Sequence, residues 1–175
     1  GKPGDNLTPI DAVKFAAAYG TWLKNQSNQS EYKVIVGRDA RISGQMVSQL
    51  VCSTLQGLGI NVVDLGLSTT PTVEVMVTHL HADGGIILTA SHNPKEWNAL
   101  KLLNAKGEFV SAADGAQILA FADKDDYTFA EVDDLGSYET FDDAIDLHIE
   151  KILALPLVNT KAIQEKNFKV AIDAV

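Results

Sequence analysis

The sequence has little that would suit a secreted or membrane-bound protein. It contains one cysteine, Cys52, among 175 residues, which excludes an internal disulfide framework and a cysteine-rich zinc site. No apolar run is long enough to span a bilayer. The first residues, GKPGDNLTP, lack the apolar core of a signal peptide. We therefore expect a cytoplasmic protein without a membrane partner.

Basic residues are also scarce. The chain has 14 Lys and Arg residues against 23 Asp and Glu residues, so its formal net charge is −9. Nucleic-acid phosphates require a basic face, and this balance argues against such a partner. Hydrophobic residues make up 46% of the chain and charged residues 21%, an ordinary globular composition. The length is sufficient for one domain with a sizeable core.

Helix and strand patterns alternate along the whole chain. Thr8 and Pro9 predict a helix start, with Thr8 as the N-cap and Pro9 in the first turn. Further helices are expected over residues 43–58, 70–80, 112–123 and 141–153, and strands over residues 33–37, 60–65, 84–89 and 100–103. Such alternation predicts an α/β fold, with layered helices on a mixed, mostly parallel sheet.

The C-terminal end carries a further strand pattern, FKVAI, over residues 168–172, after a polar linker that begins at residue 159. A terminal strand can pair into the same sheet. We favour a second interpretation, in which residues 1–158 form one domain and residues 159–175 are a linker and the first strand of another domain that continues beyond this chain.

The strongest candidate for a functional site is the segment GGIILTASHNPKEWNALK, residues 84–101. A buried strand leads into a Ser-His-Asn-Pro turn at its carboxyl end, which is where ligands bind in open α/β sheets. Pro94 biases Asn93 away from helical backbone, so the loop is expected to be extended or tightly turned. Ser91 would then present its hydroxyl on a rigid rim.

Two interpretations of Ser91 follow from the residues alone. The nucleophile-elbow pattern Gly-X-Ser-X-Gly is absent, because Thr89 and Asn93 flank Ser91. In an extended segment neighbouring side chains point to opposite faces, so His92 would be poorly placed to activate Ser91. Serine hydrolase chemistry is therefore disfavoured, whereas a purely structural polar turn remains open.

The motif TASHNP, with a lysine ten positions after its serine, resembles the catalytic serine motif of the α-D-phosphohexomutases. This superfamily contains phosphoglucomutase, phosphomannomutase and phosphoglucosamine mutase. Leu7-Thr8-Pro9 and the VGRDAR stretch at residues 36–41 match the family in order and spacing. The last residues, FKVAIDAV, resemble the opening strand of the family's second domain, so the chain resembles domain I.

The resemblance implies a mechanism that interconverts hexose 1-phosphate and hexose 6-phosphate. Ser91 would carry a phosphoryl group, donate it to a hexose phosphate and recover the other phosphate from the bisphosphorylated sugar. Hexose 1,6-bisphosphate would act as the activator. The family has four domains, so the rest of the same polypeptide is the expected partner and the isolated fragment is expected to be inactive.

The family also uses Mg²⁺, which the Ser91 phosphate would bind together with aspartates from a second-domain loop. Lys101 matches the family lysine that assists proton transfer, and His92 is expected to hydrogen-bond near the transferring phosphate. The implied catalytic residues are Ser91, Lys101 and His92, and the implied phosphate- or substrate-binding residues are Asn93, Lys95 and Arg38.

The arginines of the VGRDAR stretch have an alternative role. For Arg38 and Arg41, salt bridges to Asp39 or hydrogen bonds to loop carbonyls are at least as well supported as contact with phosphate. Because the net charge of −9 repels anionic sugars, binding would depend on a local group of basic side chains and Mg²⁺.

The chain departs from the family pattern before its lysine. It has Trp97-Asn98-Ala99 where the family often has Tyr-Asn-Gly, and Trp97 can pack where a tyrosine would. An alternative function is a non-catalytic binding or regulatory module that retains the fold. Intact Ser91 and Lys101 argue for the enzyme, and glucose, mannose and glucosamine phosphates all remain candidate substrates.

Overall fold

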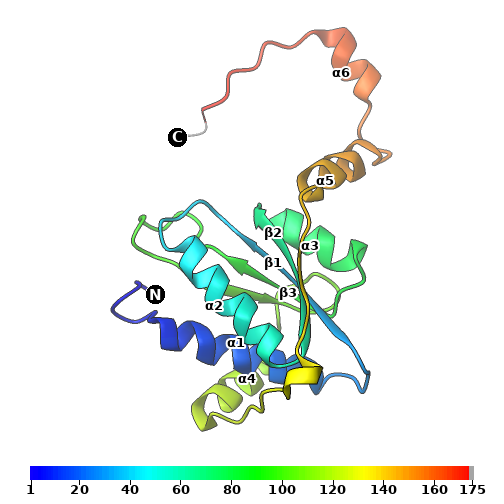
Figure 1. The fold of residues 1–175 in the computed structure, drawn as a ribbon. Helices are drawn as coiled ribbons and strands as arrows, with labels where there is room; N and C mark the ends of the chain where they lie inside the picture. The colour runs from blue at the N-terminus through cyan, green and yellow to red at the C-terminus, as the bar shows by residue number, and fades with distance from the viewer. Residues whose placement is uncertain (174–175) are drawn as a thin grey trace.

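The computed structural model describes residues 1–173 and contains a five-stranded sheet in the order β4-β3-β1-β2-β5 (Figure 1). Its strands are β1 (Tyr32–Arg38), β2 (Ile60–Leu67), β3 (Gly84–Leu88), β4 (Leu100–Leu103) and β5 (Tyr138–Thr140). β1 pairs in parallel with β2 and β3, and β5 pairs in parallel with β2. β4 is antiparallel to β3. The predicted α/β fold with a mixed, mostly parallel sheet is confirmed.

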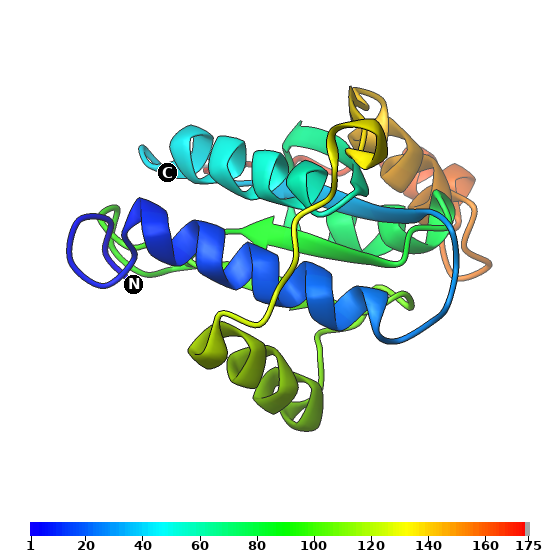
Figure 2. The ribbon, with the colours of Figure 1, turned by 60° about the horizontal axis from the view of Figure 1, so that its bottom comes forward.

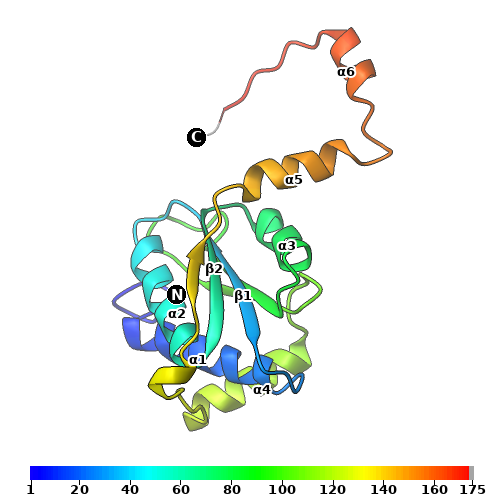
Figure 3. The same ribbon diagram turned by 45° about the vertical axis from the view of Figure 1, so that its right-hand side comes forward.

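Helices cover both faces of the sheet (Figure 3). One face packs against α1 (Pro9–Lys24), α2 (Gly44–Gly57) and α4 (Ala112–Lys124), and the other against α3 (Thr70–His79) and the start of α5 (Ala144–Leu153). Figure 2 shows α1 and α2 side by side along the sheet, with α4 against α1.

Alternate residues of each central strand enter different halves of the core. Val34 and Val36 of β1 contact the apolar cluster on the α1 face, whereas Ile35 belongs to the cluster on the α3 face, and all three are fully buried. This follows from the two-residue side-chain period of a strand. Burial on both faces explains why the strand sequences are continuously apolar.

The first helix begins where the sequence predicts. Thr8 is the N-cap of α1, and its Oγ1 accepts a hydrogen bond from the backbone N–H of Asp11 at 3.3 Å. The Asp11 carboxylate in turn accepts from the backbone N–H of Thr8 at 2.7 Å. The Thr8 hydroxyl also donates to that carboxylate at 2.7 Å, and this bond, followed by the one from the Thr8 N–H, lowers the pKa of Asp11 because both favour its charged form.

Several C-terminal features differ from the predictions. β5 and the short 3₁₀ helix Val132–Asp134 lie where neither was expected, and α5 starts at Ala144 instead of residue 141. α6 (Thr160–Lys166) lies within the expected linker, and the Asn159 side chain caps it by accepting from the backbone N–H of Ala162 at 2.9 Å. The cap satisfies one of the free N–H groups at the start of this helix.

The strand expected over residues 168–172 is not formed. Residues 168–172 belong to no strand, and Phe168, Val170 and Ile172 are exposed. α5 and α6 lead away from the sheet, so the segment that follows is not aligned with an edge strand (Figure 1). Residues 174 and 175 of the same assignment lie outside the described residues, and the domain boundary at residue 158 stays a prediction.

A bilayer span requires a long, apolar helix, and residues 1–173 contain none.

Candidate active site

The loop after β3, residues 89–99, contains the serine motif. Ser91 has a left-handed backbone with φ of 55°, a conformation that non-glycine residues adopt at a cost. Both the backbone N–H and the side-chain amide of Asn93 donate to the carbonyl of Ala90, at 3.1 and 2.8 Å. These bonds close a tight turn, and Ser91 is exposed on its outer side.

The tight turn changes the relationship between Ser91 and His92. Ser91 Oγ lies 3.4 Å from His92 Nδ1, although an extended backbone would have separated the two side chains. The expectation of opposite-facing side chains is wrong because the left-handed Ser91 reverses the chain direction. His92 has no other hydrogen bond within residues 1–173, so this part of the chain supplies no third group to orient it as in a hydrolase triad.

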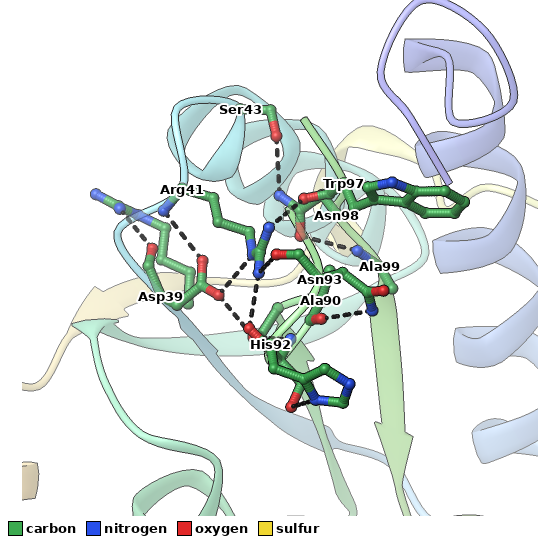
Figure 4. A network of polar contacts seen from close by, with 12 residues as sticks. Asp39, Arg41, Ser43, Ala90, His92, Asn93, Trp97, Asn98 and Ala99 are labelled. Atoms are coloured by element: carbon green, nitrogen blue, oxygen red, sulfur yellow. Dashed lines mark hydrogen bonds and ion pairs between the residues drawn. The ribbon is translucent and has the colours of Figure 1, made fainter. Parts of the chain in front are cut away.

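A single guanidinium group, that of Arg41, holds the loop from its inner side (Figure 4). Arg41 Nη2 donates to the carbonyls of Ser91 at 2.7 Å and Asn93 at 2.8 Å. Arg41 Nη1 donates to the carbonyls of Pro94 at 2.7 Å and Trp97 at 2.9 Å. The loop carbonyls therefore converge on one side chain, which is only 11% exposed.

Asp39 holds Arg41 in place and extends the network to the serine backbone. Its Oδ2 accepts from Arg41 Nε at 3.0 Å and from the Thr89 hydroxyl at 2.6 Å. Thr89 Oγ1 in turn accepts from the backbone N–H of Ser91 at 2.9 Å. The loop after β1 is thus joined to the loop after β3 by side-chain hydrogen bonds, in addition to the backbone bond from the Asp39 N–H to the Leu88 carbonyl at 3.1 Å.

Asn98 anchors the far end of the loop and is fully buried. Its Nδ2 donates to Ser43 Oγ, beside the start of α2, at 3.0 Å, and its Oδ1 accepts from the backbone N–H of Ala99 at 2.8 Å. Trp97 is half-buried, with the Lys2 ammonium 5.3 Å from its ring centroid. A buried amide with these partners fixes where the loop returns to β4.

Arg38 points elsewhere, although it belongs to the same stretch of sequence as Arg41. It lines a cavity of about 420 Å³ beside α2, and Ser91 is not among the lining residues. Within the described part of the chain, its side chain makes one hydrogen bond, from Nη1 to the carbonyl of Asp39 at 3.2 Å. A phosphate-binding role for Arg38 stays a prediction, and the arginine that contacts the serine loop is Arg41.

The two lysines of the predicted site differ in position. Lys95 is exposed within the loop. Lys101 lies in β4 opposite Ile87, and its Nζ is 5.9 Å from the ring centroid of Phe109. No interaction joins either lysine to Ser91 within the described part of the chain, so their roles in phosphate binding and proton transfer stay predictions.

Thr89 and Asn98 were not predicted as site residues. The suggested salt bridge to Asp39 and the suggested hydrogen bonds to loop carbonyls are confirmed for Arg41. The VGRDAR stretch was the available signal, because its Asp and second Arg can pair across a short loop. The acceptors of Arg41 are main-chain carbonyls, whose direction the side-chain sequence does not encode.

Residues 1–173 contain no group of three His, Cys, Asp or Glu side chains that could hold a metal ion. Asp39, the carboxylate that contacts the loop network, is already bound by Arg41 and Thr89. These residues therefore do not fit a magnesium site by themselves.

Comparison with known proteins gives consistent matches. Residues 1–129 match the family model described as phosphoglucomutase/phosphomannomutase, alpha/beta/alpha domain I. The chain is 34% identical over 173 residues to a phosphoglucomutase/phosphomannomutase of Thermococcus kodakarensis, which covers 99% of this chain and 37% of that protein. It is 38% identical over 140 residues to a phosphoglucosamine mutase of Pediococcus pentosaceus, covering 78% of this chain and 31% of that protein.

A solved structure of a phosphoglucomutase/phosphomannomutase family protein from Burkholderia thailandensis superposes with a TM-score of 0.76 at 25% identity. The match covers 87% of this chain and 33% of that one. The chain therefore spans about a third of the length of the proteins it matches.

Proposed function

Because this chain belongs to the phosphoglucomutase/phosphomannomutase family, as its α/β/α domain I, we propose that it carries the phosphorylated serine of a phosphohexomutase. The whole protein would interconvert hexose 1-phosphate and hexose 6-phosphate. The observation that carries the proposal is the exposed Ser91 hydroxyl, on a loop whose backbone Arg41, Asp39 and Thr89 fix. Group transfer between two oxygens depends mainly on such positioning.

The proposed reaction has two phosphoryl transfers, one from Ser91 to the sugar and one from the sugar back to Ser91. In the first, the bond between phosphorus and Ser91 Oγ breaks, a bond to the free hydroxyl of the hexose phosphate forms, and that hydroxyl loses its proton. In the second, the bond between the other sugar oxygen and its phosphorus breaks in the reoriented bisphosphate, a bond from that phosphorus to Ser91 Oγ forms, and the freed sugar oxygen takes up a proton. Lys101, which matches the family lysine, is proposed to exchange the proton with the sugar hydroxyl.

Positive charge near Ser91 is the second requirement. His92, predicted as catalytic, and Lys95, predicted to bind phosphate, lie on the exposed loop with Ser91. Together with Lys101 they are proposed to bind the sugar phosphate against the net charge of −9. The Ser91 phosphate would bind Mg²⁺ together with ligands from outside residues 1–173, because residues 1–173 contain no group of side chains that could hold a metal ion.

Phosphorylation of Ser91 tests the proposal directly. The full-length protein is incubated with glucose 1,6-bisphosphate and analysed by intact mass spectrometry and peptide mapping. We expect one phosphoryl group on Ser91, none on Ser91→Ala, and an unchanged amount on Ser53→Ala, which alters an exposed serine of α2. A wild-type protein without phosphate and without turnover of glucose, mannose or glucosamine phosphates would instead indicate the non-catalytic module.

Two further measurements separate the remaining alternatives. A fluorophosphonate probe is expected to leave Ser91 unlabelled, and efficient labelling would favour a serine hydrolase. We also propose that residues 1–175 alone have no mutase activity, because they correspond to about 37% of the Thermococcus relative. Robust turnover by this chain with glucose 1,6-bisphosphate would refute that proposal.

A further inference from the structure

Arg41 has no donor left for a ligand. A guanidinium group has five N–H bonds, and the five are directed at Asp39 and at the four loop carbonyls of Ser91, Asn93, Pro94 and Trp97. Its charge is paired with the Asp39 carboxylate at 3.0 Å. Direct contact between this arginine and a substrate phosphate would require several of these bonds to break.

The network binds both the backbone N–H and the backbone carbonyl of Ser91. Arg41 binds the Ser91 carbonyl at 2.7 Å, and Thr89, itself bonded to Asp39, binds the Ser91 N–H at 2.9 Å. The left-handed conformation is unfavourable for a serine, and rotation away from it would break both bonds. The two contacts therefore keep Ser91 in the backbone conformation that exposes its side chain.

The direction of the carbonyls matters for an anionic reaction. Each carbonyl that points at Arg41 turns its negative end inward, away from the exposed side of the loop. Figure 4 shows the His92 ring on the opposite side of the loop from the Arg41 guanidinium, and Ser91 Oγ lies 3.4 Å from that ring. A phosphate transferred at Ser91 Oγ therefore lies on the side of the loop that these carbonyl oxygens do not face, so their negative ends do not repel it.

We propose that Arg41 is a positioning residue for phosphoryl transfer at Ser91, which it serves by holding the loop carbonyls inward and Ser91 in its left-handed conformation. This inference rests on the proposed function, since it assigns Arg41 a part in that reaction. It also separates the two arginines of the VGRDAR stretch: Arg41 acts through the loop, whereas Arg38 lies in the cavity beside α2.

Kinetics of the full-length protein test the proposal, with Arg41→Ala, Arg41→Lys and the matched control Lys106→Ala, which removes an exposed charge from a turn. A misplacement of about 1 Å can cost a factor of about 100 in rate, so we expect kcat of Arg41→Ala to fall by about that factor. KM for the hexose phosphate should stay within about threefold, because Arg41 does not bind substrate. Lys106→Ala should behave like the wild type.

Two readouts distinguish positioning from a general loss of structure. Added guanidinium ion should restore part of the kcat of Arg41→Ala and leave Lys106→Ala unchanged. Arg41→Lys should remain slow at an unchanged thermal midpoint, because an ammonium group has three N–H donors in place of five. If Arg41→Ala does not fold, the kcat of Arg41→Lys decides: a rate near that of wild type overturns the proposal.

The outcomes for the two proposals are separate. A wild-type protein that takes no phosphate on Ser91 contradicts the proposed function. A wild-type protein that is phosphorylated while a folded Arg41→Ala keeps its kcat, or loses only substrate affinity, contradicts the positioning role.

Discussion

The hydroxyl of Thr89 donates to Asp39 Oδ2 at 2.6 Å and so joins the end of β3 to the loop that follows β1. The two strands are parallel neighbours, with Arg38 opposite Leu88 at their carboxyl ends. Strands in this arrangement bring their following loops to one edge of the sheet. Because the two loops are close at this edge, the Thr89–Asp39 hydrogen bond can connect the β1 loop to the serine loop.

Replacing Thr89 with valine should weaken the connection between the β1 loop and the serine loop. Valine keeps the shape but removes the hydroxyl, which leaves the Ser91 N–H without its partner and Asp39 Oδ2 with Arg41 Nε as its remaining donor. We expect the free energy of unfolding to fall by about 1–3 kcal/mol and hydrogen exchange at the Ser91 amide to accelerate. Urea denaturation and exchange measurements check this, with Thr89→Ser as the control that retains the hydroxyl. Equal stability of the valine variant and the wild type would contradict the role of this bond.

Asn98 and Ser43 should be energetically coupled. Asn98 is fully buried, and its amide donates to Ser43 Oγ at 3.0 Å. Ser43→Ala leaves the buried Asn98 amide without this partner, and Asn98→Ala removes its bonds to both Ser43 and the Ala99 N–H, so each variant should destabilise the protein. The double variant should lose less than the sum, with a coupling of about 0.5–3 kcal/mol. A double-mutant cycle in urea measures this value, and strict additivity would show that the contact contributes nothing.

Cys52 should be unreactive in the folded protein. Burial, followed by the charge of Asp64, raises the pKa of its thiol from 9.0 to about 12. A shift of this size lowers the thiolate fraction at mildly alkaline pH by on the order of 10³. We expect slow reaction with a disulfide reagent at pH 8 and rapid reaction in urea, followed by absorbance. Comparable rates in the two conditions would refute the prediction.

The same shift has a defined effect on stability. Because the folded pKa of Cys52 lies above the unfolded value, the neutral thiol favours the folded state. That contribution is present below about pH 9 and is lost as the pH rises toward 12. Cys52→Ser should therefore flatten the decline of stability over this range, which urea titrations at several pH values would record.

Tyr138 should titrate later than an ordinary tyrosine. Its hydroxyl donates to Asp64 Oδ2 at 2.8 Å, and this hydrogen bond, with burial as the second cause, raises the pKa of Tyr138 to about 12. Asp64→Asn removes the carboxylate, so the Tyr138 pKa should return toward 10. Absorbance titration of tyrosinate measures the shift, with Tyr138→Phe identifying the transition. If the Asp64→Asn variant keeps the wild-type pKa of Tyr138, the raised pKa has another cause.

Most of the helices and the first four strands were predictable because their signals are local. Thr8 caps α1 as expected, and the apolar strand patterns coincide with β1 to β4. β5 gave no such signal, since its three residues are all exposed. It is a strand only because it pairs with β2. Residues 168–172 are the opposite case: they have the apolar alternation of a strand but no partner strand within the described residues, and so they form no sheet there.

The α/β alternation, the identity of the serine loop and the residue types available to it follow from the local sequence, because periodicity, capping and turn preferences act over a few neighbouring residues. That Arg41, and not Arg38, contacts this loop follows from the tertiary packing. The two arginines are three residues apart, yet one meets carbonyls more than 50 positions further along the chain and the other lines a cavity beside α2. That choice depends on where two parallel strands end side by side, which is a property of long-range packing and not of the local sequence.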